Sequence, residues 1–300
     1  MKPTKIVIRE DLDHFSPVGV DWLKGFTKAG YDAILVSRDS ELVNIEADLF
    51  INMSNIHTNI EYIRQIKAKN PTTYVLCTVL KPLEKLEPYF NYVDCWFDLG
   101  AYHPYYQEWF ESRDQKFISV LEASDPEELY DLKIPNSQKT DFSFVGQFGN
   151  TGHGYRHEDL YLYPFIDDSA LSHNLFGFSY KTVPYRRVNF KDINLVYNNS
   201  IINVNFHYSF QKYENVVLNR RTFHVAMSGN FQLIDHPNYP DLFNELPSYP
   251  DPIDFREAFY YYKNNKEERS KITKEAQEWA LKHHTWEVRM NELLKTIQDV

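Results

Sequence analysis

Cysteine and long apolar runs are both scarce in this sequence. The 300 residues include two cysteines, Cys77 and Cys95, which stand in no metal-ligand spacing. A disulfide framework and a cysteine-based zinc site are therefore excluded. No apolar run approaches the roughly 18 residues that a membrane-spanning helix needs, and the apolar stretch at the N-terminus is too short for a signal peptide. We expect a cytoplasmic protein with reduced thiols, at most peripheral to the inner face of a membrane.

An excess of basic residues is also lacking. Lysine and arginine number 32 against 42 aspartates and glutamates, which gives a formal net charge of −10. Because contacts with nucleic-acid phosphates need an excess of Lys and Arg, this balance predicts that nucleic acid is not a partner. The composition is 43% hydrophobic and 25% charged, which is typical of a globular protein with ample core material. The length suits two domains of about 150 residues each.

Short β-type runs alternate with amphipathic helical patterns through most of the chain. In the first part, helical patterns begin near Val18 and Ile60, and a turn-rich stretch at 124–140 is the best candidate for a linker. A second series of alternating elements follows, with a helix at 219–228, and the chain is helical from about residue 250 onward. The predicted strands are 5–9, 33–36, 49–51, 73–79, 93–97, 117–121, 142–146, 174–178, 200–206 and 231–234.

Strands that alternate with helices indicate βαβ units and parallel sheets. We therefore predict an α/β protein with two Rossmann-like domains that face each other across a cleft. The expected boundaries are 1–125 for the first domain and 126–275 for the second, with a C-terminal helix at 276–300 that crosses back to the first. Ligands of open parallel sheets bind at the carboxyl ends of the strands.

A basic cluster surrounds the start of the helix predicted at 219–228. Lys212 lies in the polar loop that precedes it, and Arg220 and Arg221 follow its first residue, Asn219. Helix N-termini attract anions, and the arginine fork matches phosphate oxygens. The cluster is therefore a candidate diphosphate site, although Lys and Arg at a helix start are also common on a solvated surface.

The segment 218–231, which reads LNRRTFHVAMSGNF, resembles the Asn-x-Arg-x-Phe-Glu signature of a known family. This is the spore-maturation-protein-B-like family, or glycosyl transferases group 1, whose members have the GT-B fold. Residues 121–126, 142–146, 191–200 and 263–289 resemble the family's linker, first donor-domain strand, short helix and C-terminal helix pair, in the same order. The resemblance extends over about 117–298.

This resemblance implies a metal-independent transferase that moves a sugar from a nucleotide-diphosphate donor to a glycan, lipid or protein acceptor. The nucleotide sugar, UDP- or GDP-linked, is a cosubstrate, and no other cofactor is implied. The donor would bind the second domain, where Asn219 and Arg221 match motif positions near the phosphates and Gly146 matches the small residue of the first loop. By charge and position, Lys212 and Arg220 join this donor-binding set.

The sequence departs from the family pattern at His224, which stands where relatives carry a Glu that grips the nucleotide ribose. A histidine can also bond a ribose hydroxyl or a phosphate, so we include His224 in the donor-binding set. The earlier partner of that Glu falls at Val216, whose side chain cannot form a hydrogen bond. The departure keeps open a catalytically silent GT-B-like protein that binds a glycan or a nucleotide, and a GT-B-type epimerase.

The loop after the first strand supplies the candidates for a catalytic base. Asp11, Asp13 and His14 follow residues 5–9, at the carboxyl end of the strand. Any of them could accept the proton of an acceptor hydroxyl. The alternative is a polar loop whose side chains cap the next helix.

Overall fold

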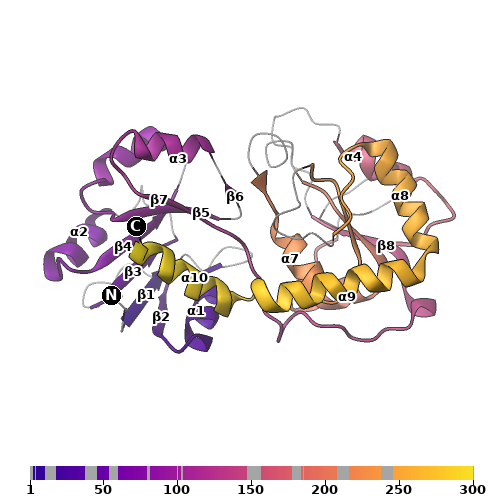
Figure 1. The fold of residues 1–300 in the computed structure, drawn as a ribbon, viewed down its shortest axis with the longest axis horizontal. Helices are drawn as coiled ribbons and strands as arrows, with labels where there is room; N and C mark the ends of the chain where they lie inside the picture. The colour runs from indigo at the N-terminus through magenta and orange to yellow at the C-terminus, as the bar shows by residue number, and fades with distance from the viewer. Residues whose placement is uncertain are drawn as a thin grey trace. The chain divides into compact units, whose positions relative to one another are not determined.

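A computed structural model of the chain divides it into two compact units. Unit 1 comprises Met1–Ala123 and His284–Val300, and unit 2 comprises Ser124–His283. Both chain ends therefore belong to unit 1 (Figure 1). The boundaries that the sequence predicts between the two domains and before the C-terminal helix are 125/126 and 275/276. The structure describes residues 3, 5–10, 18–37, 46–53, 60–79, 82–99, 101–102, 104–146, 157–177, 184, 186–207, 216–237 and 246–299.

Unit 1 is built around a six-stranded parallel sheet with the order β2-β1-β3-β4-β5-β7. The strands alternate with helices along the sequence, as the hydrophobic pattern predicts. The strands are β1 (Lys5–Arg9), β2 (Asp32–Val36), β3 (Leu49–Asn52), β4 (Tyr74–Thr78), β5 (Cys95–Leu99), β6 (Ala101–Tyr102) and β7 (Phe117–Val120). The helices are α1 (Val18–Lys28), α2 (Ile60–Lys69), the 3₁₀ helix η3 (Leu83–Tyr89), α3 (Pro104–Glu111) and α10 (Trp286–Asp299).

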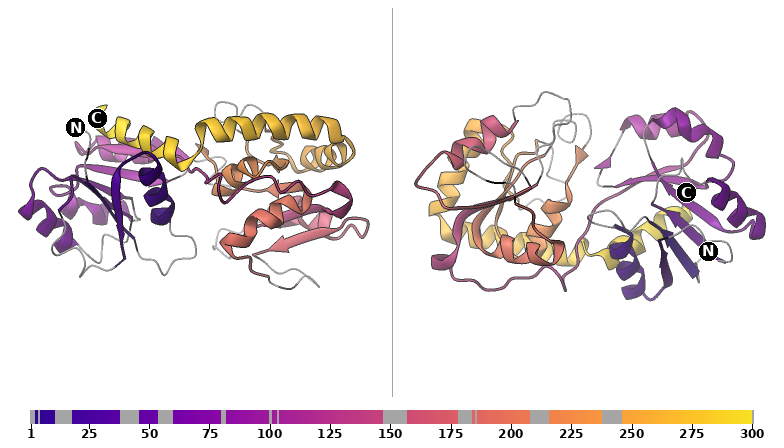
Figure 2. Two further views of the ribbon diagram at one scale, coloured as in Figure 1. Left: turned by 90° about the horizontal axis from the view of Figure 1, so that it is seen from below. Right: turned by 180° about the vertical axis from the view of Figure 1, so that it is seen from behind.

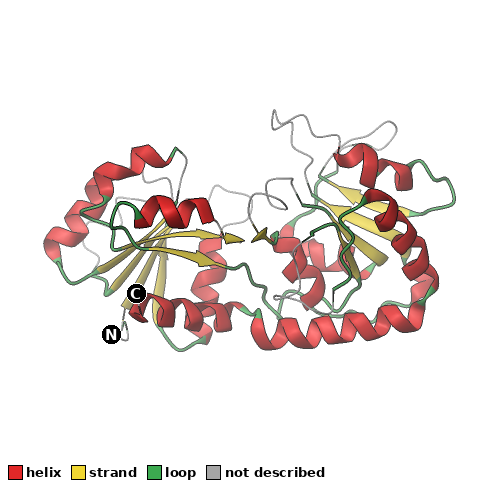
Figure 3. Cartoon of the chain, turned by 45° about the horizontal axis from the view of Figure 1, so that its top comes forward, coloured by secondary structure: helices red, strands yellow, loops and turns green. Residues whose placement is uncertain are grey.

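Helices cover both faces of this sheet (Figure 3). On one face, Trp22 and Phe26 of α1 pack with Trp286 and Met290 of α10. On the other, α2, η3 and α3 bury an aromatic cluster in which the rings of Trp96 and Phe110 stack with centroids 5.5 Å apart. The last helix of the chain thus completes the core of the first unit, because its apolar face is buried there.

Unit 2 contains a smaller parallel sheet with the order β12-β10-β8-β9. Its strands are β8 (Thr140–Val145), β9 (His173–Phe176), β10 (Ser200–Asn205) and β12 (Gln232–Ile234), and β11 (Val216–Val217) lies outside this sheet. The helices are α4 (His157–Tyr161), α5 (Tyr163–Ile166), α6 (Ile193–Asn198), α7 (Arg220–Met227), α8 (Pro252–Asn264) and α9 (Lys266–His283), with the 3₁₀ helices η4 (Asn136–Gln138) and η5 (Phe190–Asp192).

The sheet of unit 2 is also covered on both faces. Helices α4, α5 and α8 pack on one face around Phe142, Phe165 and Phe259. Helices α6, α7 and α9 pack on the other, around Phe223 and Ala276. Figure 2 shows α9 running alongside α7. Packing in the second of these layers fixes α7 against the sheet.

The stretch that the sequence indicated as a linker is a strap on unit 2. The backbone N–H of Tyr130 donates to Asn194 Oδ1 at 3.2 Å, and that of Leu132 donates to Asn198 Oδ1 at 2.8 Å, both on α6. Leu129, also on this stretch, is buried in the core that α6, α7 and α9 form. Among the described residues, no helix has both the length and the apolar character required to cross a bilayer.

Candidate functional site

The N-terminus of α7 is fixed at the carboxyl end of β10. Asn219 caps the helix, because its Oδ1 accepts the backbone N–H of Thr222 at 3.3 Å. Its Nδ2 donates to Asn205 Oδ1 at 2.8 Å and to the Phe206 carbonyl at 3.1 Å. One asparagine therefore satisfies a helix N–H and ties the helix to the strand end.

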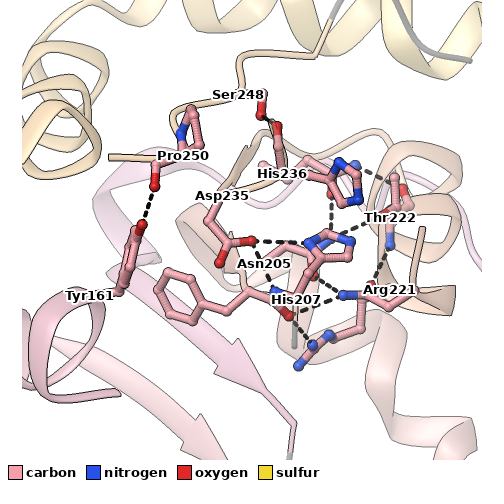
Figure 4. A network of polar contacts seen from close by, with 12 residues as sticks. Tyr161, Asn205, His207, Arg221, Thr222, Asp235, His236, Ser248 and Pro250 are labelled. Atoms are coloured by element: carbon pink, nitrogen blue, oxygen red, sulfur yellow. Dashed lines mark hydrogen bonds and ion pairs between the residues drawn. The ribbon is translucent and has the colours of Figure 1, made fainter. Parts of the chain in front are cut away.

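A buried polar network extends this anchor to the neighbouring strand (Figure 4). Asn205 Nδ2 donates to Thr222 Oγ1 at 2.9 Å and to Gln232 Oε1 at 3.3 Å. Gln232 Nε2 in turn donates to the Thr222 carbonyl at 2.7 Å. All three side chains are almost completely buried. Because buried polar groups are costly without partners, this network fixes the position of α7 relative to β10 and β12.

The guanidinium of Arg221 lies between the ends of β8 and β10. Its Nη1 donates to the carbonyl of Val145 and its Nη2 to the carbonyl of Phe206, the latter at 2.7 Å. The guanidinium carbon lies 5.1 Å from the centre of the Phe144 ring. A Cβ atom on Gly146 would overlap Arg221 Nη1 and would lie 2.8 Å from Phe144 Cζ. Glycine at 146 is therefore what admits the arginine to this position.

Arg220 and His224 interact with each other on the same helix. Arg220 Nε donates to His224 Nε2 at 3.0 Å, and both side chains lie against the ring of Phe190. Burial, followed by the charges of Arg220 and Arg221, holds the pKa of His224 well below its usual range. The imidazole is therefore neutral, and its Nε2 serves as an acceptor for Arg220 rather than as a cation.

A second histidine, which is not among the predicted site residues, lies at this edge of the sheet. His207 follows β10, and both its backbone N–H and its Nδ1 lie within 3.0 Å of Asp235 Oδ1, beyond the end of β12. Burial lowers the pKa of His207 to about 4, although Asp235 acts to raise it. Since Nδ1–H donates to the carboxylate, Nε2 carries the lone pair; this buried atom has no hydrogen-bond partner among the described residues.

The sequence contained a usable signal for this pair. Asn205, His207 and Asp235 are polar residues placed just where two predicted strands end, and carboxyl ends of parallel strands share one edge. The centre of the His236 ring lies 5.0 Å from that of the His207 ring, so His236 adds another polar side chain at this edge of the sheet (Figure 4).

The predicted donor-binding residues fall into two groups. Gly146, Asn219 and Arg221 lie together at the carboxyl ends of β8 and β10, whereas Arg220 and His224 pair along α7, with His224 buried. Lys212 lies outside the described residues. The candidate bases Asp11, Asp13 and His14 lie outside them as well.

Comparison with known proteins identifies the family. The model of the glycosyl transferase-like family matches residues 141–295, more than half of the chain. The chain belongs to the glycosyl transferase-like family. Comparison with curated proteins gives no significant sequence match. The matched residues include all the described side chains named above around the N-terminus of α7.

Solved structures of low sequence identity share the fold over nearly the whole chain. An alpha-glucosyltransferase in complex with UDP-glucose and DNA containing an abasic site is 12% identical, with a TM-score of 0.70 and 98% of each chain covered. Sucrose-phosphate synthase from Thermosynechococcus elongatus is 9% identical, with a TM-score of 0.61 and coverage of 99% and 98%. An Anabaena protein in complex with UDP and glucose is 6% identical, with a TM-score of 0.63 and coverage of 99% and 100%. The predicted GT-B fold and glycosyltransferase family are confirmed.

One sequence-based prediction about partners is wrong. The acidic balance predicts that nucleic acid is not a partner, yet glycosyltransferases of this fold include alpha-glucosyltransferases in complex with DNA. Net charge averages over the whole surface, whereas phosphate contacts depend on the local distribution of Lys and Arg. A formal charge of −10 therefore does not exclude a nucleic-acid partner for this glycosyltransferase.

Proposed function

We propose that this glycosyltransferase moves a hexose from a nucleotide-diphosphate sugar to an acceptor hydroxyl, with the diphosphate bound at the N-terminus of α7. One observation carries the proposal. The first turn of α7 contains Arg220 and Arg221 and no acidic residue. A positive side chain near the positive end of a helix macrodipole is unfavourable and costs about 0.3–1 kcal/mol of stability. A bound anion would reverse that penalty, because it interacts favourably with both arginines and with the helix.

The same arrangement suits the chemistry of donor cleavage. When the bond between the sugar and the diphosphate breaks, negative charge grows on the departing phosphate oxygens. Arg221 is already held by the carbonyls of Val145 and Phe206, so its positive charge is in place before the reaction. Preorganised charge of this kind lowers the transition-state energy. We propose that it takes the part that a divalent metal plays in other transferases.

Uridine is the first base to test for the donor. Several structures that share the fold are described as complexes with UDP or UDP-glucose, and guanosine is the alternative that the sequence resemblance leaves open. The loop after β1, with Asp11, Asp13 and His14, is the proposed source of the base that accepts the proton of the acceptor hydroxyl.

Ligand-induced stabilisation tests the donor site directly. UDP or GDP at millimolar concentration, with EDTA present, should raise the melting temperature of the wild type, because a ligand at about 100 times its Kd adds about 2.7 kcal/mol. Arg221→Gln should abolish the shift. Arg256→Gln, which removes an exposed arginine from α8, is the matched control and should keep it. The ligand-induced shift of each variant is compared with its own ligand-free melting temperature.

Two outcomes would contradict the proposal. A melting temperature unmoved by either nucleotide would remove the donor site, and an equal shift in Arg221→Gln would place the nucleotide elsewhere. Hydrolysis and transfer assays with UDP-hexoses then separate an active transferase from a nucleotide-binding protein. Nucleotide binding without any turnover, across donors and acceptors, would favour the silent alternative raised by His224.

A further inference from the structure

A polar cavity of about 340 Å³ lies at the opposite edge of the sheet of unit 2. It is lined by the strap at 131–139, by the turn at 229–231 and by α9. Lys139 directly precedes β8, and Phe231 directly precedes β12, so the cavity is at the amino ends of the strands. Since a strand rises about 3.3 Å per residue, the length of β8 separates this cavity from the Arg221 site by about 20 Å.

The cavity concentrates positive charge in an acidic protein. Its lining includes one acidic side chain, Asp131, and five basic ones: Lys133, Lys139, Lys266, Arg269 and Lys274. Lys133 pairs with Asp131 at 2.6 Å, and Lys274 pairs with Glu278 at 3.8 Å. Among the described residues, no carboxylate forms an ion pair with Lys139, Lys266 or Arg269. A surplus of positive charge therefore faces this cavity.

Arg269 and Lys139 are held rather than loosely solvated. Arg269 is 6% exposed, and its Nη1 donates to the carbonyls of Tyr262 and Lys263 at the end of α8. Lys139 Nζ lies 3.3 Å from Asn230 Oδ1. Burial lowers the pKa of both basic groups; for Lys139, the nearby Asp131 carboxylate acts to raise the pKa and the charge of Arg269 acts to lower it. Two partly desolvated cations that repel each other favour an anion between them.

The rest of the lining is neutral and polar. Ser270, Thr273 and Gln277 follow one another at helical spacing on the cavity face of α9, and Asn136 lies across from them on the strap. Hydroxyl and amide groups of this kind bond the hydroxyls of a ligand. The volume is within the usual range for small-molecule sites.

We propose that this cavity binds a small phosphorylated sugar or polyol. Lys139, Lys266 and Arg269 take the phosphate, and the polar face of α9 takes the hydroxyls. A phosphomonoester fits better than a phosphodiester backbone, because a terminal phosphate can enter a cavity with only one substituent leaving it. The site is distinct from the proposed diphosphate site at the other end of the strands.

Calorimetric titration of the full-length protein tests this site. Glucose 6-phosphate is the probe; inorganic phosphate and glucose are compared with it. We expect binding of glucose 6-phosphate at about 1 mM or tighter, at least fivefold weaker binding of phosphate, and none of glucose. The double variant Lys139→Gln/Lys266→Gln should weaken binding by at least about tenfold, as expected when charge-assisted hydrogen bonds are removed. Lys271→Gln, on the same helix but outside the cavity, should bind normally.

Further arms separate the alternatives. Arg221→Gln should leave binding of glucose 6-phosphate unchanged, which keeps this test independent of the donor site. The proposal would be overturned if titration with about 10 mM glucose 6-phosphate gave no heat of binding, or if the double variant bound it as tightly as the wild type. So would phosphate that binds as tightly as glucose 6-phosphate, or duplex DNA that displaces the probe through the same two lysines. Thermal unfolding of each variant verifies that it is folded, and Arg269 is left intact because it joins α8 to α9.

Discussion

Substitution of Gly146 by alanine should displace the arginine of the proposed donor site. The added Cβ would overlap Arg221 Nη1 and lie 3.0 Å from Arg221 Cζ, so the guanidinium must move. Its bonds to the carbonyls of Val145 and Phe206 would then be broken or distorted. The backbone itself is not the obstacle, because Gly146 is not among the residues with positive φ.

The magnitude follows from the contacts that are lost. A hydrogen bond from a charged donor contributes about 1.5–3 kcal/mol. Arg221 makes two such bonds to carbonyls, but it is partly exposed, so water can replace part of them. We therefore expect Gly146→Ala to lower the free energy of unfolding of unit 2 by about 2 kcal/mol. The loss is no larger because the displaced Arg221 side chain can turn partly toward solvent. Affinity for a nucleotide diphosphate should fall by at least about tenfold.

A double-mutant cycle with Arg221→Lys tests the cause. Lysine lacks the planar fork that reaches both carbonyls, so it leaves room for the Cβ at 146. Urea unfolding of the wild type, both single variants and the double variant gives the coupling free energy between the two positions. We expect Gly146→Ala to cost at least about 1 kcal/mol less in the Arg221→Lys background. Equal costs in the two backgrounds would show that the overlap with Arg221 is not the reason for glycine at 146.

Two further predictions concern stability. The pKa of His207 is lowered to about 4 in the folded protein, so between pH 6.5 and 4 only the unfolded chain binds a proton at this side chain, and the free energy of unfolding falls as the pH is lowered. His207→Gln should flatten this pH dependence by up to about 1.4 kcal/mol per pH unit. Urea-unfolding free energies of the wild type and the variant that change in parallel with pH would refute this prediction. In unit 1, a Cβ on Gly25 would lie 2.6 Å from the carbonyl oxygen of Trp286, so Gly25→Ala should lower the free energy of unfolding by about 1–3 kcal/mol. Thr27→Ala, at an exposed position of the same helix, is the control and should change it by no more than about 0.5 kcal/mol. Equal effects of the two substitutions would contradict the tight packing of α1 on α10.

The strands were the easiest elements to predict from sequence. Strands of a parallel sheet covered on both faces are continuous apolar runs, and β1 and β3 occupy nearly the predicted residues. Helix α3 was not predicted, although Tyr106, Trp109 and Phe110 on it are buried. A short helix dense in aromatic residues carries little periodic signal, and packing on the sheet of unit 1 decides its conformation.

The strand ends indicate which polar residues share one edge of the sheet, but the side-chain contacts of the candidate site were predictable only where a continuous segment encodes them. Asn219 and Arg221 stand in one motif at a helix start, so sequence alone places them together. His207 and Asp235 meet because β10 and β12 pair in a register that puts Asn205 opposite Ile234. Sequence patterns do not give that register, since the two strands are joined through α7. The role of Gly146 is of the same kind, because the clash that excludes a side chain comes from an arginine on another element.

The prediction about nucleic acid failed for a reason that also bears on the proposed anion sites. A sum of 32 basic and 42 acidic residues describes the whole surface and says nothing of where like charges gather. In unit 2, Arg220 and Arg221 gather at one edge of the sheet, and Lys139 and Arg269 gather at the other. Like charges that gather at one place create a local positive potential that attracts anions, so each cluster is better evidence about ligands than the net charge. The excess of acidic residues elsewhere does not cancel either one, because exposed charges farther away than a Debye length, about 8 Å at physiological ionic strength, are largely screened.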